Sequence, residues 1–401
     1  MQPHWDQGIF DDGMNVSQVA KGLAGLTRLM IPPNGSSIIF ELPLERHPQT
    51  MEDRSNASTV FLEAICQYLA NLANREDPPW LHLTFVGLVN SGNSWSWVSR
   101  AGTMYPRALS LTMEYCSFRN LDSVKAFTER FSYIQSFSCK NVQWPRSCLV
   151  NALSTDNVAF TLPTEWTANL KKLSIRVSSL GDIWFLRQLN SRAGGNLQKL
   201  VIEWDDGRWH DRENLKLLHE LRHIDLRRHP CLCDLRLTAT SIMNVNRTYS
   251  SVVGMASRLL DRYAPAYASD DYRTWDGKEM RYYNWLNTVT LDLTSALTTH
   301  LSTGLPSSMK DQINDLWHYL RELAQASTMD PSNGIMCLRV VLPDATNSSP
   351  CLSEAQRIFR RIISETDVVM KFMPASRAHE PTASDVFDYC MRLACQSDMH
   401  M

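Results

Sequence analysis

The sequence has no long apolar run and no excess of charge of one sign. No stretch of about 18 consecutive apolar residues occurs among its 401 residues, which predicts no membrane-spanning helix. Its 40 basic and 42 acidic residues leave a net charge of −2, so no global field attracts nucleic acid or an anionic membrane surface. We therefore predict neither a nucleic-acid partner nor a membrane partner.

Three signatures of common enzyme classes are also lacking. The sequence has no G-x-S-x-G nucleophile elbow, no glycine-rich phosphate loop and no dinucleotide-binding fingerprint. We accordingly predict that the protein is not an enzyme, with no catalytic residue, no metal ligand and no cofactor. An enzyme with an unfamiliar site within residues 205–275 is kept as a remote hypothesis, because geometry rather than spacing defines a catalytic constellation.

Two clusters of ligand-type residues lie near the middle of the chain. The first combines thiols and imidazoles, at Cys231, Cys233, His223 and His229. We interpret its cysteines as thiols packed in a strand, because structural zinc sites use Cys-x2–4-Cys spacings and a second ligand pair. The second cluster is acidic, at Asp205, Asp206, His210 and Asp211. We interpret it as a polar turn with helix-capping acids.

The ten cysteines do not form the spaced pairs of a disulfide framework. Several of them occupy apolar positions of the repeat described below, where a free thiol packs as a small hydrophobe. This usage is typical of a reducing compartment. Residues 1–6 show neither the basic start nor the apolar segment of a secretory signal. We expect an intracellular protein, cytoplasmic or nuclear.

The clearest positive signal is a pattern that occurs twice between residues 107 and 144. Residues 110–118 and residues 136–144 are about 26 positions apart and carry apolar side chains at the same places. The matched pairs are Leu111 and Phe137, Met113 and Cys139, Cys116 and Val142, and Phe118 and Trp144. We predict a strand at each copy.

An amphipathic helix is predicted between these two strands. Its apolar residues recur at helical spacing, at Leu121, Val124, Phe127 and Phe131. A strand, a helix and the same strand again is one unit of an α/β repeat array.

The same alternation extends over most of the chain. We predict further strands near residues 37–42, 80–85, 169–177, 196–204, 221–226, 233–237, 287–293, 337–342 and 368–372. We predict helices near residues 61–72, 180–189, 252–263, 313–323 and 354–363.

The predicted fold is α/β, a leucine-rich-repeat-like curved solenoid with a parallel concave sheet and outer helices. The solenoid is predicted over residues 59–372, with an irregular insertion at 239–284. Residues 1–58 are predicted as an irregular segment with possible first strands. Residues 373–401 are predicted as a tail or a capping helix.

Several of these units resemble the leucine-rich-repeat regions of fungal, mushroom-type F-box proteins. The resemblance covers roughly residues 60–372, and residues 109–118, 131–144 and 221–226 carry it. It implies that the repeats hold a substrate while an N-terminal F-box binds the adaptor of a ubiquitin ligase. The sequence departs from this family at residues 40–48, an F-box-like stretch that begins at Phe40 and meets a second proline at Pro48, so it does not continue as a helix.

Strand positions between the apolar ones are predicted to face outward on the concave sheet. The charged members of this set are Glu114, Lys140, Arg176, Glu203, Asp225, Arg227, Arg236, Asp292 and Arg339. They either read a protein partner by charge complementarity or form neutralising pairs on a solvated face.

An aromatic loop is the second candidate binding region. Its residues are Tyr272, Trp275, Tyr282 and Tyr283, and it either anchors an interface or packs as a lid on the solenoid edge. We expect a protein-binding module, the substrate-recognition region of an F-box-type ubiquitin ligase receptor. The alternative is a repeat scaffold without a ubiquitin role.

Overall fold

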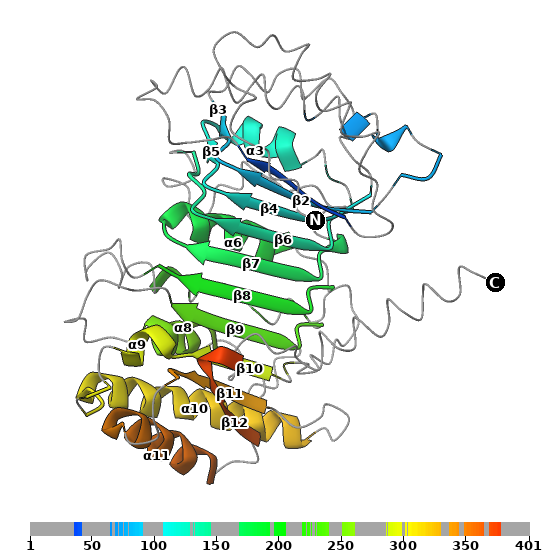
Figure 1. The fold of residues 1–401 in the computed structure, drawn as a ribbon. Helices are drawn as coiled ribbons and strands as arrows, with labels where there is room; N and C mark the ends of the chain where they lie inside the picture. The colour runs from blue at the N-terminus through cyan, green and yellow to red at the C-terminus, as the bar shows by residue number, and fades with distance from the viewer. Residues whose placement is uncertain are drawn as a thin grey trace. The chain divides into compact units, whose positions relative to one another are not determined.

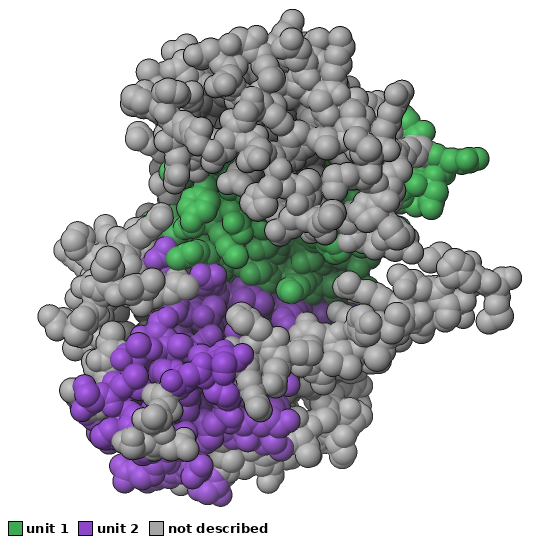
Figure 2. Space-filling model, in the orientation of Figure 1, with its two compact units in different colours: residues 1–197 green, residues 198–401 purple. Residues whose placement is uncertain are grey.

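The computed structural model describes residues 36–41, 65–90, 107–145, 168–192, 196–205, 219–239, 251–260, 286–329, 337–344 and 349–377, with short gaps inside several of these ranges. The chain divides into two compact units, Met1–Leu197 and Gln198–Met401 (Figure 2). Each unit contains its own parallel strands and its own helices. The predicted α/β class with a parallel sheet is confirmed.

In the first unit the strands follow chain order across the sheet (Figure 1). They are β1 (Ser36–Glu41), β2 (Leu81–Val86), β4 (Ala108–Glu114), β6 (Ser136–Lys140) and β7 (Lys172–Val177). A short side ladder pairs β3 (Val89–Asn90) with β5 (Ser117–Phe118). The helices are α3 (Leu121–Thr128) and α6 (Leu180–Arg192). Every strand pair described in this unit is parallel.

The second unit repeats this arrangement with more helix. Its strands are β8 (Lys199–Trp204), β9 (Asp234–Ala239), β10 (Thr288–Asp292), β11 (Cys337–Leu342) and β12 (Val369–Pro374), paired in parallel in that order. Its helices are α8 (Ser251–Leu260), α9 (Thr294–Thr298), α10 (Ser307–Met329), α11 (Pro350–Ser364) and the short 3₁₀ helix η6 (Ala375–Arg377). Helix α10 packs against both α8 and α11.

The register between β4 and β6 confirms the repeat predicted from the sequence. Leu111 pairs with Phe137, and Met113 pairs with Cys139. All four side chains are buried, while the residues between them are half-buried. Because side chains alternate across a strand, matched register stacks apolar residues on one side and polar residues on the other.

A left-handed residue ends each of three consecutive strands in the first unit. Gly87, Tyr115 and Asn141 have φ angles of 75°, 55° and 53°. The predicted strands over residues 110–118 and 136–144 are therefore wrong at Tyr115 and Asn141, where the chain turns and β4 and β6 have ended. Backbone pairing nevertheless continues through the turns, since Gly87 N donates to Glu114 O at 2.9 Å and Tyr115 N donates to Lys140 O at 3.0 Å.

Trp144 is the centre of an aromatic stack in the first unit. Its ring stacks on Phe118, with centroids 5.9 Å apart, and on Phe185 of α6, with centroids 4.2 Å apart. Its indole Nε1 donates a hydrogen bond of 2.7 Å to Asp182 Oδ1. Gly181 lies directly against the indole, because a Cβ added there would lie 2.8 Å from Trp144 Cβ and Cδ1.

Asp182 is completely buried and closes the start of α6. Its Oδ2 accepts hydrogen bonds from Ser178 N at 2.9 Å and from Ser179 Oγ at 2.8 Å. Asp182 N donates in turn to Ser179 Oγ at 3.2 Å. This reciprocal arrangement is a variant of the capping box in which the carboxylate accepts from Ser178 N, and it also satisfies Asp182 N and the indole of Trp144.

Several boundaries differ from the sequence predictions. The described residues of the segment 221–226 form no strand: Leu221 ends a helical turn, and β8 pairs directly with β9, which leaves no place for a strand between them. Helix α10 is longer than predicted, and α9 was not predicted. Of the predicted terminal segments, 1–58 and 373–401, only residues 36–41 and 373–377 are described.

No helix among the described residues is long and apolar enough to cross a membrane. The cysteines that the structure describes are all free, and Cys116, Cys139 and Cys351 are buried. Burial raises the pKa of the Cys116 thiol to about 12, which suits packing rather than reactivity.

Gly181→Ala is predicted to destabilise the protein. The added methyl collides with an indole held between two other rings, and overpacking of this kind costs about 1–3 kcal/mol, more than the ~1 kcal/mol that alanine gains over glycine in a helix. Gly304→Ala is the matched control, since its Cβ meets only Glu354 Oε2 at 3.6 Å. Urea unfolding measures both variants. Equal midpoints would contradict the packing described for Trp144.

The buried Asp182 is predicted to make stability fall as pH rises. Burial raises the pKa of its carboxyl to about 6, against about 3.9 in an unfolded chain. The folded state therefore binds the proton more tightly, and this contribution, about 3 kcal/mol, is complete below about pH 4 and lost by about pH 6. Free energies of unfolding between pH 4 and 7, compared with Asp182→Asn, test it. If the wild type instead became more stable relative to Asp182→Asn as the pH rises from 4 to 7, the hydrogen bonds to the carboxylate would outweigh the cost of its burial.

Candidate functional site

The polar side of each sheet is the broadest candidate surface. We define the polar face as the strand side chains that alternate with the buried apolar ones. In the first unit it is lined with hydroxyl groups in cross-strand rows, one of which runs through Thr84, Thr112, Ser138 and Ser174. In the neighbouring row a hydrogen bond of 2.7 Å joins His82 Nδ1 and Ser110 Oγ.

Two predicted site residues meet on the polar face of the first unit. Glu114 and Lys140 are register partners on β4 and β6, and Lys140 Nζ lies 3.5 Å from Glu114 Oε1. Both side chains are partly exposed, so the pair contributes about 0–1 kcal/mol. Arg176 lies on the same face of β7 and is half-buried.

The second unit gathers cations in one cross-strand row. Arg236 of β9, Thr290 of β10, Arg339 of β11 and Lys371 of β12 are successive register partners, so three cations share one row. We call these three cations the basic row. Arg236 Nη2 lies 3.5 Å from Asp292 Oδ2. Arg339 Nε is buried and has no hydrogen-bond partner among the described residues.

The described members of the predicted charged set stand at strand positions that alternate with buried apolar residues. Glu203 lies half-buried at such a position of β8. Lys371 was missed, although it stands at an alternating position of the last strand. Asp225, Arg227 and the aromatic loop residues Tyr272, Trp275, Tyr282 and Tyr283 lie outside the described residues.

A buried ion pair stands at the start of the second unit. Lys199 Nζ of β8 lies 2.9 Å from Asp234 Oδ2 of β9, and the two side chains are only 13% and 2% exposed. The two residues are register partners, so strand pairing itself brings the charges together. Sequence reasoning did not single out this pair, because alternation alone cannot tell a buried lysine from an exposed one.

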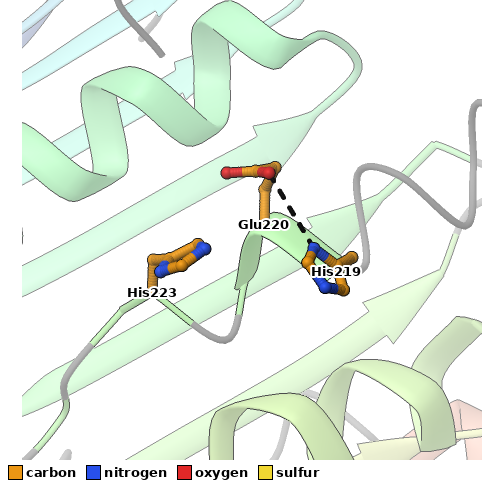
Figure 3. A group of neighbouring side chains, drawn as sticks. All are labelled: His219, Glu220 and His223. Carbon is orange, nitrogen blue, oxygen red and sulfur yellow. Dashed lines mark ion pairs between the residues drawn. The ribbon is translucent and has the colours of Figure 1, made fainter. Parts of the chain in front are cut away.

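A cluster of two imidazoles and a carboxylate lies before β9. His219, Glu220 and His223 place one ligand-type atom each within 4.8 Å of one another (Figure 3). His219 Nδ1 is 3.9 Å from Glu220 Oε1, and the two imidazole rings are 6.3 Å apart. Sequence reasoning missed this cluster, although its signal is the H-E-x-x-H spacing of the residues themselves.

The structure tests part of each of the two clusters of ligand-type residues that the sequence suggested. Cys231 is exposed in a turn, and Cys233 precedes β9 and donates its thiol to Gln198 O at 3.3 Å, so neither thiol is packed within a strand. Within the described ranges the only metal-type group is that of His219, Glu220 and His223. Asp205 is buried directly after β8, whereas its acidic neighbours lie outside the described residues.

Comparison with known proteins does not assign this chain to a family. No family profile matches the sequence, and a search among curated proteins gives no significant match.

Lys199→Met is predicted to destabilise the second unit by about 3–5 kcal/mol, because it leaves the buried Asp234 carboxylate without its cation. Lys140→Met is the matched control on the polar face, and its exposed pair with Glu114 predicts a loss of at most about 1 kcal/mol. Chemical unfolding measures both variants. A loss at Lys199 no larger than that at Lys140 would contradict the buried pair.

Proposed function

We propose that this chain is a leucine-rich-repeat-like curved solenoid whose polar face binds a protein partner. Support comes from the strand order, which follows the chain within each unit, and from the register that repeats from strand to strand. Such an array offers many parallel side-chain rows on one surface and encloses no central cavity. Recognition of an extended protein surface is the function that suits this geometry.

The observation that carries the proposal is the basic row on the second unit. Arg236, Arg339 and Lys371 share this row, and Arg236 also pairs with Asp292. Lys371 is exposed on β12, where the row ends. Complementary potentials select partners and fix their register, so we infer an acidic segment as the part of the partner that meets this row.

A role as the substrate-recognition region of an F-box-type ubiquitin ligase receptor is part of this proposal. Its support is the resemblance of residues 60–372 to that family's repeats. The F-box-like text at residues 40–48 does not supply the adaptor-binding helix at its first residues, because Phe40 and Glu41 belong to β1 and pair with β2. The second candidate, a repeat scaffold without a ubiquitin role, is favoured by this observation.

Neutralising the basic row is predicted to remove the partner. The variant Arg236→Ser, Arg339→Ser, Lys371→Ser is compared with wild type by affinity capture of the full-length tagged chain from its own cells, followed by mass spectrometry. Loss of several charge contacts at about 1.4 kcal/mol per tenfold predicts at least a tenfold loss of the captured partner.

A charge-matched variant controls for net charge. Arg258, Arg357 and Arg361 are exposed on helices of the same unit, so replacing all three with serine changes the net charge equally and leaves the polar face intact. Equal capture by wild type and both variants would refute partner binding at the basic row. Recovery of the adaptor and the cullin subunit of a ubiquitin ligase supports the receptor role. If both are absent while other partners are captured in a charge-dependent way, the scaffold role is supported.

A further inference from the structure

The segment that carries His219, Glu220 and His223 is fixed to the core at its apolar positions. Leu221 is completely buried, and Ile224 is 1% exposed. His219 keeps 47% of its side-chain surface exposed, and Glu220 keeps 16%. The polar side chains thus stand at the surface on a backbone that the buried neighbours hold in place, which is the arrangement that a preorganised ligand set needs.

The local backbone explains why the glutamate joins the two histidines. His223 N donates to Glu220 O at 3.1 Å, and Ile224 N donates to Leu221 O at 2.9 Å. These are bonds across three residues, the 3₁₀ type that tightens the last turn of a helix. Side chains at positions i and i+3 are eclipsed in such a turn, so Glu220 and His223 share one side.

We propose that His219, Glu220 and His223 bind a divalent transition-metal ion, with Zn²⁺ as the best match. Two imidazole nitrogens and one carboxylate oxygen form the donor set, and Figure 3 shows the imidazoles on either side of Glu220. Calcium and magnesium prefer sites made of oxygen ligands, whereas zinc accepts nitrogen and oxygen together.

The distances fit an ion after small side-chain rotations. Zinc binds nitrogen and carboxylate oxygen at about 2.0–2.2 Å, so two ligands of one ion lie within about 4 Å of each other. The three ligand atoms already lie within 4.8 Å of one another. Because the protein supplies three ligands on a partly exposed surface, at least one coordination position remains for water.

The tightened turn distinguishes this site from the peptidase arrangement of the same spacing. In metallopeptidases the H-E-x-x-H residues lie on a continuous helix, where the two histidines bind zinc and the glutamate acts as a general base. Here the helix ends within the motif, and the Glu220 carboxylate lies with the imidazoles. We therefore assign Glu220 as a ligand, and the proposal includes no hydrolytic step.

Zinc titration of the full-length chain tests the proposal. Isothermal titration with Zn²⁺ gives affinity and stoichiometry, and the visible absorption of bound Co²⁺ reports nitrogen and oxygen ligation. His219→Ala and His223→Ala are each expected to weaken the histidine-dependent Zn²⁺ binding at least tenfold, and Glu220→Gln by a similar factor. His318→Ala is the matched control, since His318 is exposed on α10 and outside the cluster.

Binding by the cysteine thiols contributes the same background to every variant, so the comparison isolates the cluster. Circular dichroism checks that each variant is folded, and His219→Ala changes an exposed side chain only. Unchanged Zn²⁺ affinity and stoichiometry in the His219→Ala, His223→Ala double variant would overturn the site. Full affinity in Glu220→Gln would overturn the assignment of Glu220 as a ligand.

Discussion

Parallel pairing of strands in matched register is the constraint on which the rest of this structure depends. A strand exposes alternate side chains on opposite sides, so a shift of one residue would move every apolar side chain to the polar face. Between β4 and β6 the pairing holds Leu111 beside Phe137 and Glu114 beside Lys140. The same rule, applied in the second unit, brings Lys199 to Asp234 and lines up the basic row.

The connection between β7 and α6 is stabilised by a polar group that is completely buried in the core. Asp182 shows how this works, because one carboxylate caps α6 and also accepts the indole hydrogen bond of Trp144. A buried polar group is tolerated when its partners are all supplied, and here they come from adjacent residues and from one ring of the aromatic stack. The helix start and the apolar core are thus coupled through a single side chain.

Both candidate sites, the basic row and the His219, Glu220 and His223 cluster, lie at the surface of the second unit. On the polar face charges meet across strands, and the basic row places three cations, Arg236, Arg339 and Lys371, at one register level. The His219, Glu220 and His223 cluster arises differently, from a tightened helix end held down by Leu221 and Ile224. The two features belong to separate elements of the second unit, so the protein-binding proposal and the metal proposal stand or fall independently.

Local patterns in the sequence were sufficient for most strands and helices, because alternation and helical spacing are properties of neighbouring residues. The strand Cys337–Leu342 was predicted with its observed bounds, and the pairing of the two copies near residues 110 and 136 followed from their matched apolar positions. Residues 221–226 were misjudged, because apolar residues spaced two and three apart fit a strand edge and a helix end equally well. Only the tertiary structure decided that β8 pairs directly with β9 and that Tyr115 turns left-handed between two paired strands. These outcomes depend on hydrogen bonds between segments that are far apart along the chain, which a local pattern of residues does not specify.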